Sequence, residues 1–400
     1  MAEETQAMKL PIPAPAAESA PLPRATLTDT QKAMYATVLD KVAALTEVAC
    51  SSKHADKSGP LTDAERAWLS RDCILRYLRA AKWNAASAFE RVVATLVWRR
   101  EYELDGFTAD YISPEQETGK QLILGFDKEG RPCLYLNPGR QNTHTSQRQV
   151  HHMFFMVERL IDVMPPGVET LALMINFKQS KTKYPQSVSM SMSREVLHIL
   201  QNHYPERLGR CLIINVHWVI QGFFKLINPF IDPVSRAKLK FNEDMRQYVP
   251  PEQLWSADWD GELDFDYDHE AYWPALMEMC RQKKEARIAR WEAAGKHIGE
   301  SEDYMAGSTD ESVFGFKFDA AAAKEGGKAV EKTVEETVEE KVEVNTEGKI
   351  EEEVKTEVET EVKTEEKIEE KVEVKTEETV EEKVVEKMAE VKLENGAVPA

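Results

Sequence analysis

The sequence lacks any run of apolar residues that could cross a membrane, since no stretch of its 400 residues approaches the roughly 20 that a spanning helix needs. Its first residues, MAEETQAMKLPIPAPAA, have neither the basic start nor the apolar core of a signal peptide. The five cysteines are scattered and form no C-x-x-C pair, which argues against a disulfide framework and a zinc ribbon. These absences predict an intracellular, soluble protein.

Signatures of common enzyme classes are also missing. There is no G-x-G-x-x-G after a strand, no G-x-x-x-x-G-K-[ST], no G-x-S-x-G and no H-E-x-x-H. The pattern S-x-x-K occurs at residues 180–183 and 235–238, but the companion motifs of that nucleophile are absent. We predict no metal site, because His151 and His152 have no third ligand at a suitable spacing. The sequence therefore favours a binding protein over an enzyme.

Aromatic residues are absent from the end of the chain, where none follows Phe318. Residues 331–400 contain 25 Glu and 11 Lys, so they carry −14 of the total net charge of −19. A segment of this composition cannot bury enough apolar surface to offset the loss of chain entropy. We expect residues 301–400 to form a disordered acidic tail. Residues 1–27, which are rich in Pro and Ala, are expected to be a disordered linker.

The body between these segments has two patterns. Residues 28–110 have helical spacing, with a capping box at Thr62–Glu65 and a helix cap at Asn84. Beyond them, short apolar strands alternate with helices of 10–20 residues, which predicts a largely parallel sheet covered on both faces. The predicted fold class is α/β, with a helical N-terminal lobe at 28–110, an α/β lobe at 111–275 and a C-terminal helix at 276–300. We place the strands at 122–126, 133–136, 171–177 and 211–216.

Residues 217–230, HWVIQGFFKLINPF, form a helical pattern that is apolar on nearly its whole circumference. Such a helix is either buried or faces lipid. The surrounding residues 205–240 contain six Lys or Arg and two acids. Ser235 and Lys238 lie near the start of a short helix that follows Asp232, where backbone amides favour an anion. A lipid with an anionic head group suits this region, although core burial and an ordinary solvated helix end explain the same residues.

Three segments resemble the CRAL-TRIO lipid-binding family, and especially its fungal phosphatidylinositol transfer proteins. These segments are LRYLRAAKWNAASA at 75–88, HILQNHYPERLGRCLIINV at 198–216 and FFKLINPFIDPVSRAKL at 223–239. The resemblance covers roughly residues 62–275. It implies a deep apolar pocket that holds the acyl chains of one lipid, closed by a mobile gate helix.

The resemblance also implies roles for individual residues. The head group of phosphatidylinositol would contact Lys82, Glu206, Ser235 and Lys238, whereas Ala81 stands where the family pattern has Arg. The gate helix and the pocket mouth would be formed by Trp218, Phe223, Phe224 and Ile227. Leu171 and Leu173 occupy the positions of two hydroxyl residues that help the type member of the family to hold phosphatidylcholine.

These features together predict a non-enzymatic, monomeric lipid transfer protein that exchanges phosphatidylinositol between membranes and exchanges phosphatidylcholine poorly. We expect it to be cytoplasmic, with transient peripheral contact with intracellular membranes, no cofactor and no nucleic-acid partner. A carrier of a sterol or another neutral hydrophobic ligand is the alternative. A lipid hydrolase with an unrecognised nucleophile is a remote third possibility.

Overall fold

A computed structural model describes residues 7–53, 57–184, 189–227, 229, 231 and 233–318. The predicted disordered tail beyond residue 318 lies outside these residues, as does Asp232. In the gate segment, the side chains of Phe223 and Ile227 are likewise outside the described part. Everything below concerns the compact unit that ends at Phe318.

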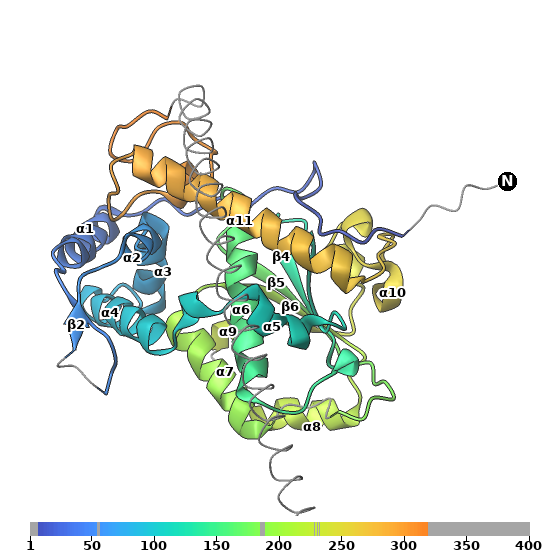
Figure 1. The fold of residues 1–400 in the computed structure, drawn as a ribbon. Coiled ribbons are helices and arrows are strands. Elements are labelled where there is room, and N and C mark those ends of the chain that lie inside the picture. Colours follow the sequence, from blue (N-terminus) through green and yellow to red (C-terminus); the bar gives the residue numbers. More distant parts are fainter. Residues whose placement is uncertain are drawn as a thin grey trace, which may run out of the picture. The chain divides into compact units, whose positions relative to one another are not determined.

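The N-terminal lobe is helical, as predicted. Helices α1, α3 and α4 pack on one another around a buried apolar cluster (Figure 1). The capping box predicted at Thr62 and Glu65 is present, and Asn84 accepts a hydrogen bond from the amide of Ser87. One feature was not expected, a small antiparallel pair formed by β1 and β2. The elements are α1 (Asp29–Ala43), β1 (Val48–Ala49), β2 (Ser58–Gly59), α2 (Asp63–Trp68), α3 (Arg71–Ala80), α4 (Ala85–Glu101), η1 (Leu104–Gly106) and α5 (Ala109–Gln116).

A five-stranded sheet forms the centre of the second lobe, in the order β3-β4-β5-β6-β7. The first two strands are antiparallel, and the remaining pairs are parallel. This confirms the predicted α/β class with a largely parallel sheet. The middle strands β5 and β6 are apolar over most of their length, and most of these residues are buried or partly buried. The strands are β3 (Gln121–Phe126), β4 (Pro132–Leu136), β5 (Leu171–Asn176), β6 (Leu208–Ile214) and β7 (Leu239–Phe241).

Helices cover this sheet and extend below it. Helix α6 packs on β3 and β4 and contacts α11, whereas α8 lies at the lower end of the lobe (Figure 1). The predicted C-terminal helix is α11, which begins at His269 and ends at Ala293. The remaining helices are η2 (Pro138–Arg140), α6 (Gln147–Val163), α7 (Met190–His203), α8 (Trp218–Ile227), α9 (Pro233–Ala237), η4 (Met245–Gln247), η5 (Pro251–Gln253), α10 (Ser256–Trp259), α11 (His269–Ala293) and α12 (Glu302–Met305).

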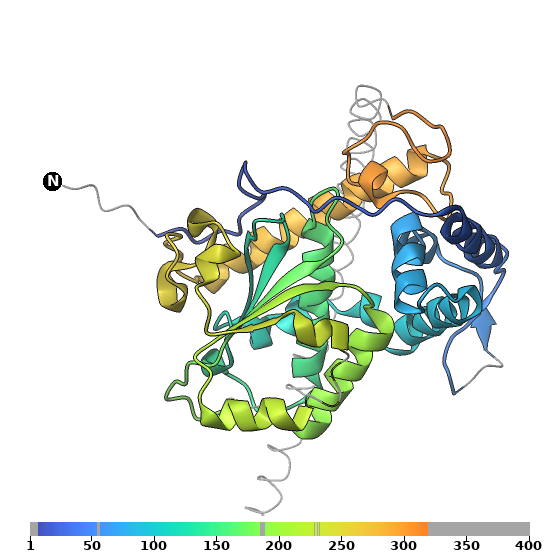
Figure 2. The ribbon, with the colours of Figure 1, turned by 180° about the vertical axis from the view of Figure 1, so that it is seen from behind.

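Residues 7–27 do not form the disordered linker that the composition predicted. They run along α11 as an extended segment (Figure 2), where the amide of Met8 donates to the carbonyl of Asp264 at 2.9 Å. At the other end of the segment, Arg24 contacts Asp72 and Asp303 at 3.2 and 2.6 Å. A proline-rich segment can lie extended on a surface because it needs no ladder of its own hydrogen bonds. Composition alone does not reveal the carboxylates that hold Arg24.

Residues 301–318 also correct the prediction, since the disordered tail was expected to begin at 301. Tyr304 and Met305 of α12 are buried against α11. Glu302 contacts Arg76 of α3 at 2.6 Å, and Arg76 also contacts Glu169 at 3.2 Å. This segment therefore belongs to the folded body, because it supplies an anionic partner to an arginine that the helical lobe buries.

Replacing Arg76 by methionine would keep a long side chain but remove the positive charge between Glu302 and Glu169. We expect the free energy of unfolding to fall by about 3 kcal/mol, because both carboxylates lose the fully buried arginine between them, although Glu169 keeps its contact with Arg79. Urea unfolding followed by tryptophan fluorescence measures the loss. The matched control is Arg281→Met on the exposed face of α11, where Arg281 pairs with Glu278 and little change is expected. Equal losses in both variants would contradict this role of Arg76.

Candidate functional site

A cavity of about 1780 Å³ opens between the sheet and helices α7, α8 and α9. Typical small-molecule pockets occupy roughly 300–1,000 Å³, so this cavity suits a larger ligand. Most of its wall is apolar and comes from β4, β5, α6, α7 and α8. Leu171, Leu173 and Ile175 alternate along β5, and they share the face of the sheet that lines the cavity. The structure therefore places both predicted pocket-strand residues in the cavity wall.

The four residues expected at a head group line this same cavity, although they come from four separate segments. Lys82 follows α3, Glu206 lies between α7 and β6, Ser235 is in α9, and Lys238 precedes β7. Lys238 is held at the sheet, because its Nζ donates to the carbonyl of Leu208 on β6 at 2.5 Å. The cluster lies at the end of the cavity where β5 and β6 begin.

Backbone strain accompanies two of these residues. Lys82 and Glu206 have φ angles of 51° and 60°, in the left-handed region of backbone conformation that residues other than glycine rarely adopt. Such conformations persist only where the surrounding structure fixes them, and they concentrate at functional sites. In this protein they turn a lysine and a glutamate at the ends of helices toward one cavity.

The sequence prediction missed two arginines at this end. Arg79 of α3 contacts Glu169 at 2.8 Å and lies 3.9 Å from Glu206, and it lines the cavity together with Arg91 of α4. Arg91 donates to the carbonyl of Gln201 at 2.9 Å. Arg79 lies in the segment 75–88, on which the family resemblance rests. It is three residues before Lys82 at the same end of α3, and this closeness in sequence could have indicated that it belongs to the same cluster. It supplies positive charge close to the position where Ala81 replaces an arginine.

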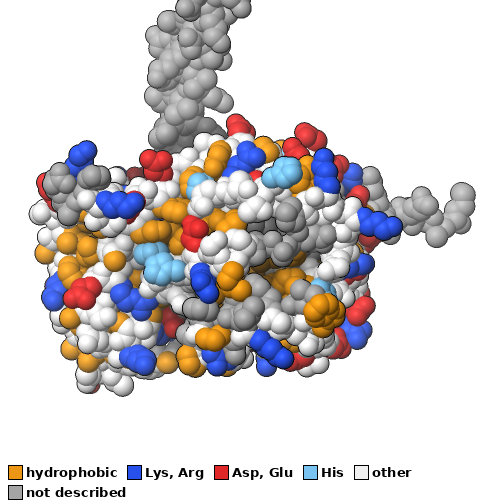
Figure 3. All heavy atoms as spheres, turned by 90° about the horizontal axis from the view of Figure 1, so that it is seen from below, with side chains coloured by type: hydrophobic (Ala, Val, Ile, Leu, Met, Phe, Trp, Pro, Cys, Tyr) orange, Lys and Arg blue, Asp and Glu red, His pale blue; other side chains and the backbone are white. Residues whose placement is uncertain are grey.

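The predicted gate residues lie on α8, which covers one side of the cavity. Phe224 lines the cavity and contacts Phe177 and Phe241, with ring centroids 6.2 and 5.1 Å away. Trp218 also borders the cavity, but 81% of its surface is exposed. The face seen from below carries hydrophobic side chains among Lys and Arg side chains (Figure 3). Phe223 and Ile227 are in the same helix, and their side chains lie outside the described part.

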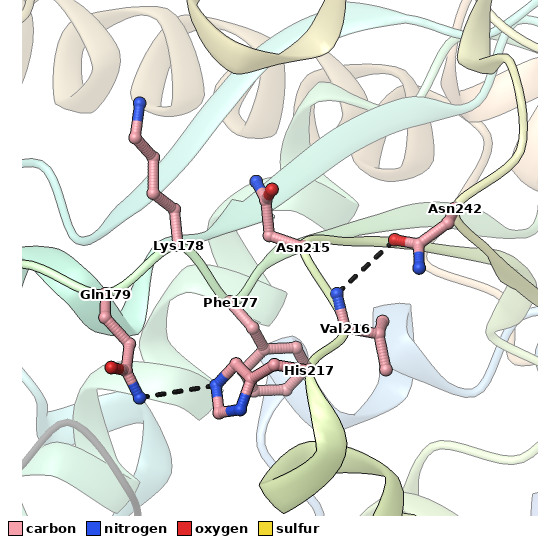
Figure 4. Close-up of a pocket in the computed structure, with 7 residues that line it drawn as sticks. All are labelled: Phe177, Lys178, Gln179, Asn215, Val216, His217 and Asn242. Atoms are coloured by element: carbon pink, nitrogen blue, oxygen red, sulfur yellow. Dashed lines mark hydrogen bonds between the residues drawn. The ribbon is translucent and has the colours of Figure 1, made fainter.

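A second, smaller cleft of about 610 Å³ lies where the chain enters and leaves the segment that contains α8. The amide of Val216 donates to Asn242 Oδ1 at 3.4 Å, and Gln179 lies 3.3 Å from His217, whereas Lys178 extends away from them (Figure 4). Asn215 donates to Asn176 Oδ1 at 2.8 Å. These side chains are therefore hydrogen-bonded within the protein at the two ends of the α8 segment.

In the described part of the chain, no helix is both long and apolar enough to cross a membrane. No three His, Cys, Asp or Glu side chains there come together in a way that could hold a metal ion.

Comparison with known proteins gives consistent matches. A family model for the CRAL/TRIO domain matches residues 116–261, and a model for its N-terminal domain matches residues 34–94. A CRAL-TRIO domain-containing protein of Schizosaccharomyces pombe is 50% identical over 293 residues, which cover 73% of this chain but only 29% of that protein. The phosphatidylinositol transfer protein PDR17 of Saccharomyces cerevisiae is 43% identical over 262 residues, covering 63% of this chain and 75% of its own. The SEC14 cytosolic factor of Candida glabrata is 27% identical over 209 residues, covering 46% and 69%.

The environment of His203 predicts that the free energy of unfolding depends on pH. His203, which immediately precedes the Tyr204-Pro205-Glu206 turn, stacks on Trp98 at 4.3 Å and lies 3.0 Å from Thr95 Oγ1. Burial lowers the pKa of His203, and with the smaller effects of His198 and Arg91 the pKa falls to about 4.

The unfolded chain binds this proton at a pKa near 6.5, so the unfolded state gains protons first as the pH falls. The free energy of unfolding should therefore decrease as the pH falls from 6.5 toward 4, and His203→Gln should flatten this part of the profile. Urea midpoints across this range measure it. Parallel profiles for the two proteins would show that His203 does not titrate in this way.

Proposed function

This chain belongs to the CRAL-TRIO family of lipid-binding proteins, and on this basis we propose that it transfers phosphatidylinositol between membranes without chemical turnover. The proposal rests on one observation: a large apolar cavity has a cluster of charged and hydroxyl-bearing side chains at one end. A lipid has this same division, with acyl chains that gain free energy on leaving water and a head group that must stay hydrogen-bonded. The similarity to the phosphatidylinositol transfer protein PDR17 supports this choice of lipid.

The chemistry of the cluster favours an inositol phosphate over a choline phosphate. Lys82 and Lys238 would pair with the phosphate, to which the Ser235 hydroxyl can donate. The Glu206 carboxylate accepts hydrogen bonds only, so it suits the hydroxyls of an inositol ring. Arg79, which contacts Glu169 and Glu206, would orient that carboxylate and add positive charge.

The apolar strand β5 argues against phosphatidylcholine in the same cavity. Leu171 and Leu173 line the wall and offer no hydrogen-bond donor to a phosphate. A phosphocholine group placed beside them would lose its hydration without compensation. We therefore propose that phosphatidylcholine is a poor ligand.

Helix α8 would act as the gate through which the lipid enters and leaves. Trp218 is exposed and Phe224 faces the cavity, so an outward movement of the helix would carry apolar side chains toward a membrane and open the cavity. Phe223 and Ile227 would contribute through the same helix. The protein would then be cytoplasmic and touch intracellular membranes transiently, in keeping with its similarity to a relative named a cytosolic factor.

Replacing Lys238 by alanine tests the head-group assignment. We expect the rate of phosphatidylinositol transfer from labelled donor vesicles to acceptor vesicles to fall roughly ten- to a hundredfold, as for the loss of a charge-assisted hydrogen bond. The matched control is Lys240→Ala, which removes the same charge two residues further along β7. Thermal unfolding of both variants identifies any loss of structure. If Lys238→Ala transfers at the rate of the parent while remaining folded, the assignment is wrong.

The leucine strand provides a second test. The parent protein should transfer labelled phosphatidylcholine much more slowly than phosphatidylinositol. The double variant Leu171→Ser, Leu173→Thr should raise phosphatidylcholine transfer several-fold and change phosphatidylinositol transfer little, because the new hydroxyls can donate to a phosphate. Leu171→Ala, Leu173→Ala is the matched control for the change in volume. A similar gain in both double variants would show that space, and not hydrogen bonding, limits phosphatidylcholine.

A further inference from the structure

The carboxylate of Glu169 is shared by three arginines, of which only Arg79 is among the residues that line the cavity. Its Oε1 lies 3.3 Å from Nε of Arg24, whereas its Oε2 lies 3.2 Å from Arg76 and 2.8 Å from Arg79. The side chain of Glu169 is 12% exposed, so water and salt screen these contacts little. One anionic group therefore connects the N-terminal segment with the proposed head-group end of the cavity.

Arg24 reaches this carboxylate from the extended segment 7–27 (Figure 2). Its guanidinium group also forms a bidentate pair with Asp303, at 2.6 and 3.1 Å, and contacts Asp72 at 3.2 Å. Asp72 is 1% exposed. The planar guanidinium group is held in one orientation when several anionic partners bind its different nitrogens. Arg24 is therefore a fixed positive charge beside Glu169.

Arg79 uses one nitrogen for its contact with Glu169. Its Nη2 donates to Oε2 of Glu169 at 2.8 Å, and its Nε lies 3.9 Å from Glu206. The other oxygen of Glu169 is in contact with Arg24. Arginine and carboxylate groups favour a bidentate pair, because their planar groups match. By contacting Oε1, Arg24 opposes such a pair and leaves the other N–H groups of Arg79 available at the cavity.

The charge of Arg24 acts in the same direction. Among the described residues, the network contains four arginines and five carboxylates, so the loss of Arg24 would leave three arginines for five carboxylates. The added negative charge would repel a phosphate at the adjacent end of the cavity. The arginines are Arg24, Arg76, Arg79 and Arg207, and the carboxylates are those of Asp72, Glu169, Glu206, Glu302 and Asp303.

We infer that Arg24 is a positioning residue for the head-group site and that it acts through Glu169 on Arg79. It holds one oxygen of Glu169 and so keeps Arg79 available to the phosphate of the bound lipid. The inference rests on the proposed binding of phosphatidylinositol, because Arg79 needs an anionic head group to contact. It extends the site to a segment that precedes residues 34–94 and 116–261, which match the two family models.

A double-mutant cycle in the full chain tests this coupling. Arg24→Gln and Arg79→Gln should each lower the rate of labelled phosphatidylinositol transfer roughly fivefold, an effect within the usual range for residues of one network. The double variant should be no slower than Arg79→Gln, because Arg24 acts through that residue. Arg24→Lys keeps the charge and should recover part of the rate. If the two losses multiply in the double variant, Arg24 acts independently of Arg79 and the inference is wrong.

The matched control is Lys9→Gln, which removes the ion pair of Lys9 with Asp268, 2.8 Å long, at the other end of the same segment. This change weakens the attachment of the segment but leaves Glu169 untouched, so transfer should stay near the rate of the parent. All proteins are compared well below their thermal midpoints. Equal slowing by Lys9→Gln and Arg24→Gln would show that the segment acts only through its attachment, and would overturn the inference.

The same assay separates failure of this inference from failure of the proposed function. A parent protein that transfers no phosphatidylinositol would overturn both. A parent that transfers it at the rate of Arg24→Gln, while Arg79→Gln is slower, would overturn the role of Arg24 alone.

Discussion

The ion pairs of Glu169 connect the two lobes around the cavity. Glu169 lies two residues before β5, and its carboxylate contacts Arg76 and Arg79 of α3 at 3.2 and 2.8 Å. Arg79 in turn lies 3.9 Å from Glu206 in the turn before β6. Two of the proposed head-group residues, Lys82 and Glu206, come from these same segments, so their relative positions depend on a few partly buried charges. Burying such charges is costly unless each has several partners, which explains why the pairs form a network.

The network also includes residues from the two described segments that flank the lobes, 7–27 and 301–318. Arg24 approaches it from the N-terminal segment, and Glu302 enters it from α12. Composition marked both segments as disordered, because one is rich in proline and the other leads into an acidic tail. A single arginine or glutamate with a buried partner can hold a segment in place even when the average composition of that segment predicts disorder. Only the folded chain shows which partner it contacts.

Polar side chains of two kinds lie at opposite ends of the cavity, along the direction of β5. Charged groups from Lys82, Glu206 and Lys238 lie where β5 begins, whereas uncharged donors and acceptors lie where β4 ends. Between them, alternate residues of β5 provide an apolar wall. The apolar stretch in the middle offers no hydrogen-bonding partner to a phosphate.

The sequence by itself determined the local elements of this protein and pointed to residues that line one cavity. Helical spacing, the capping box at Thr62 and the apolar strands were sufficient for the α/β class, because each depends on neighbouring residues. The family resemblance brought Lys82, Glu206, Ser235 and Lys238 into one hypothesis, and the structure places all four on one cavity. The tertiary structure alone decided the contacts between distant segments. The contacts of Arg79 and the anchoring of residues 7–27 and 301–318 depend on pairs far apart in the chain, which no local spacing encodes.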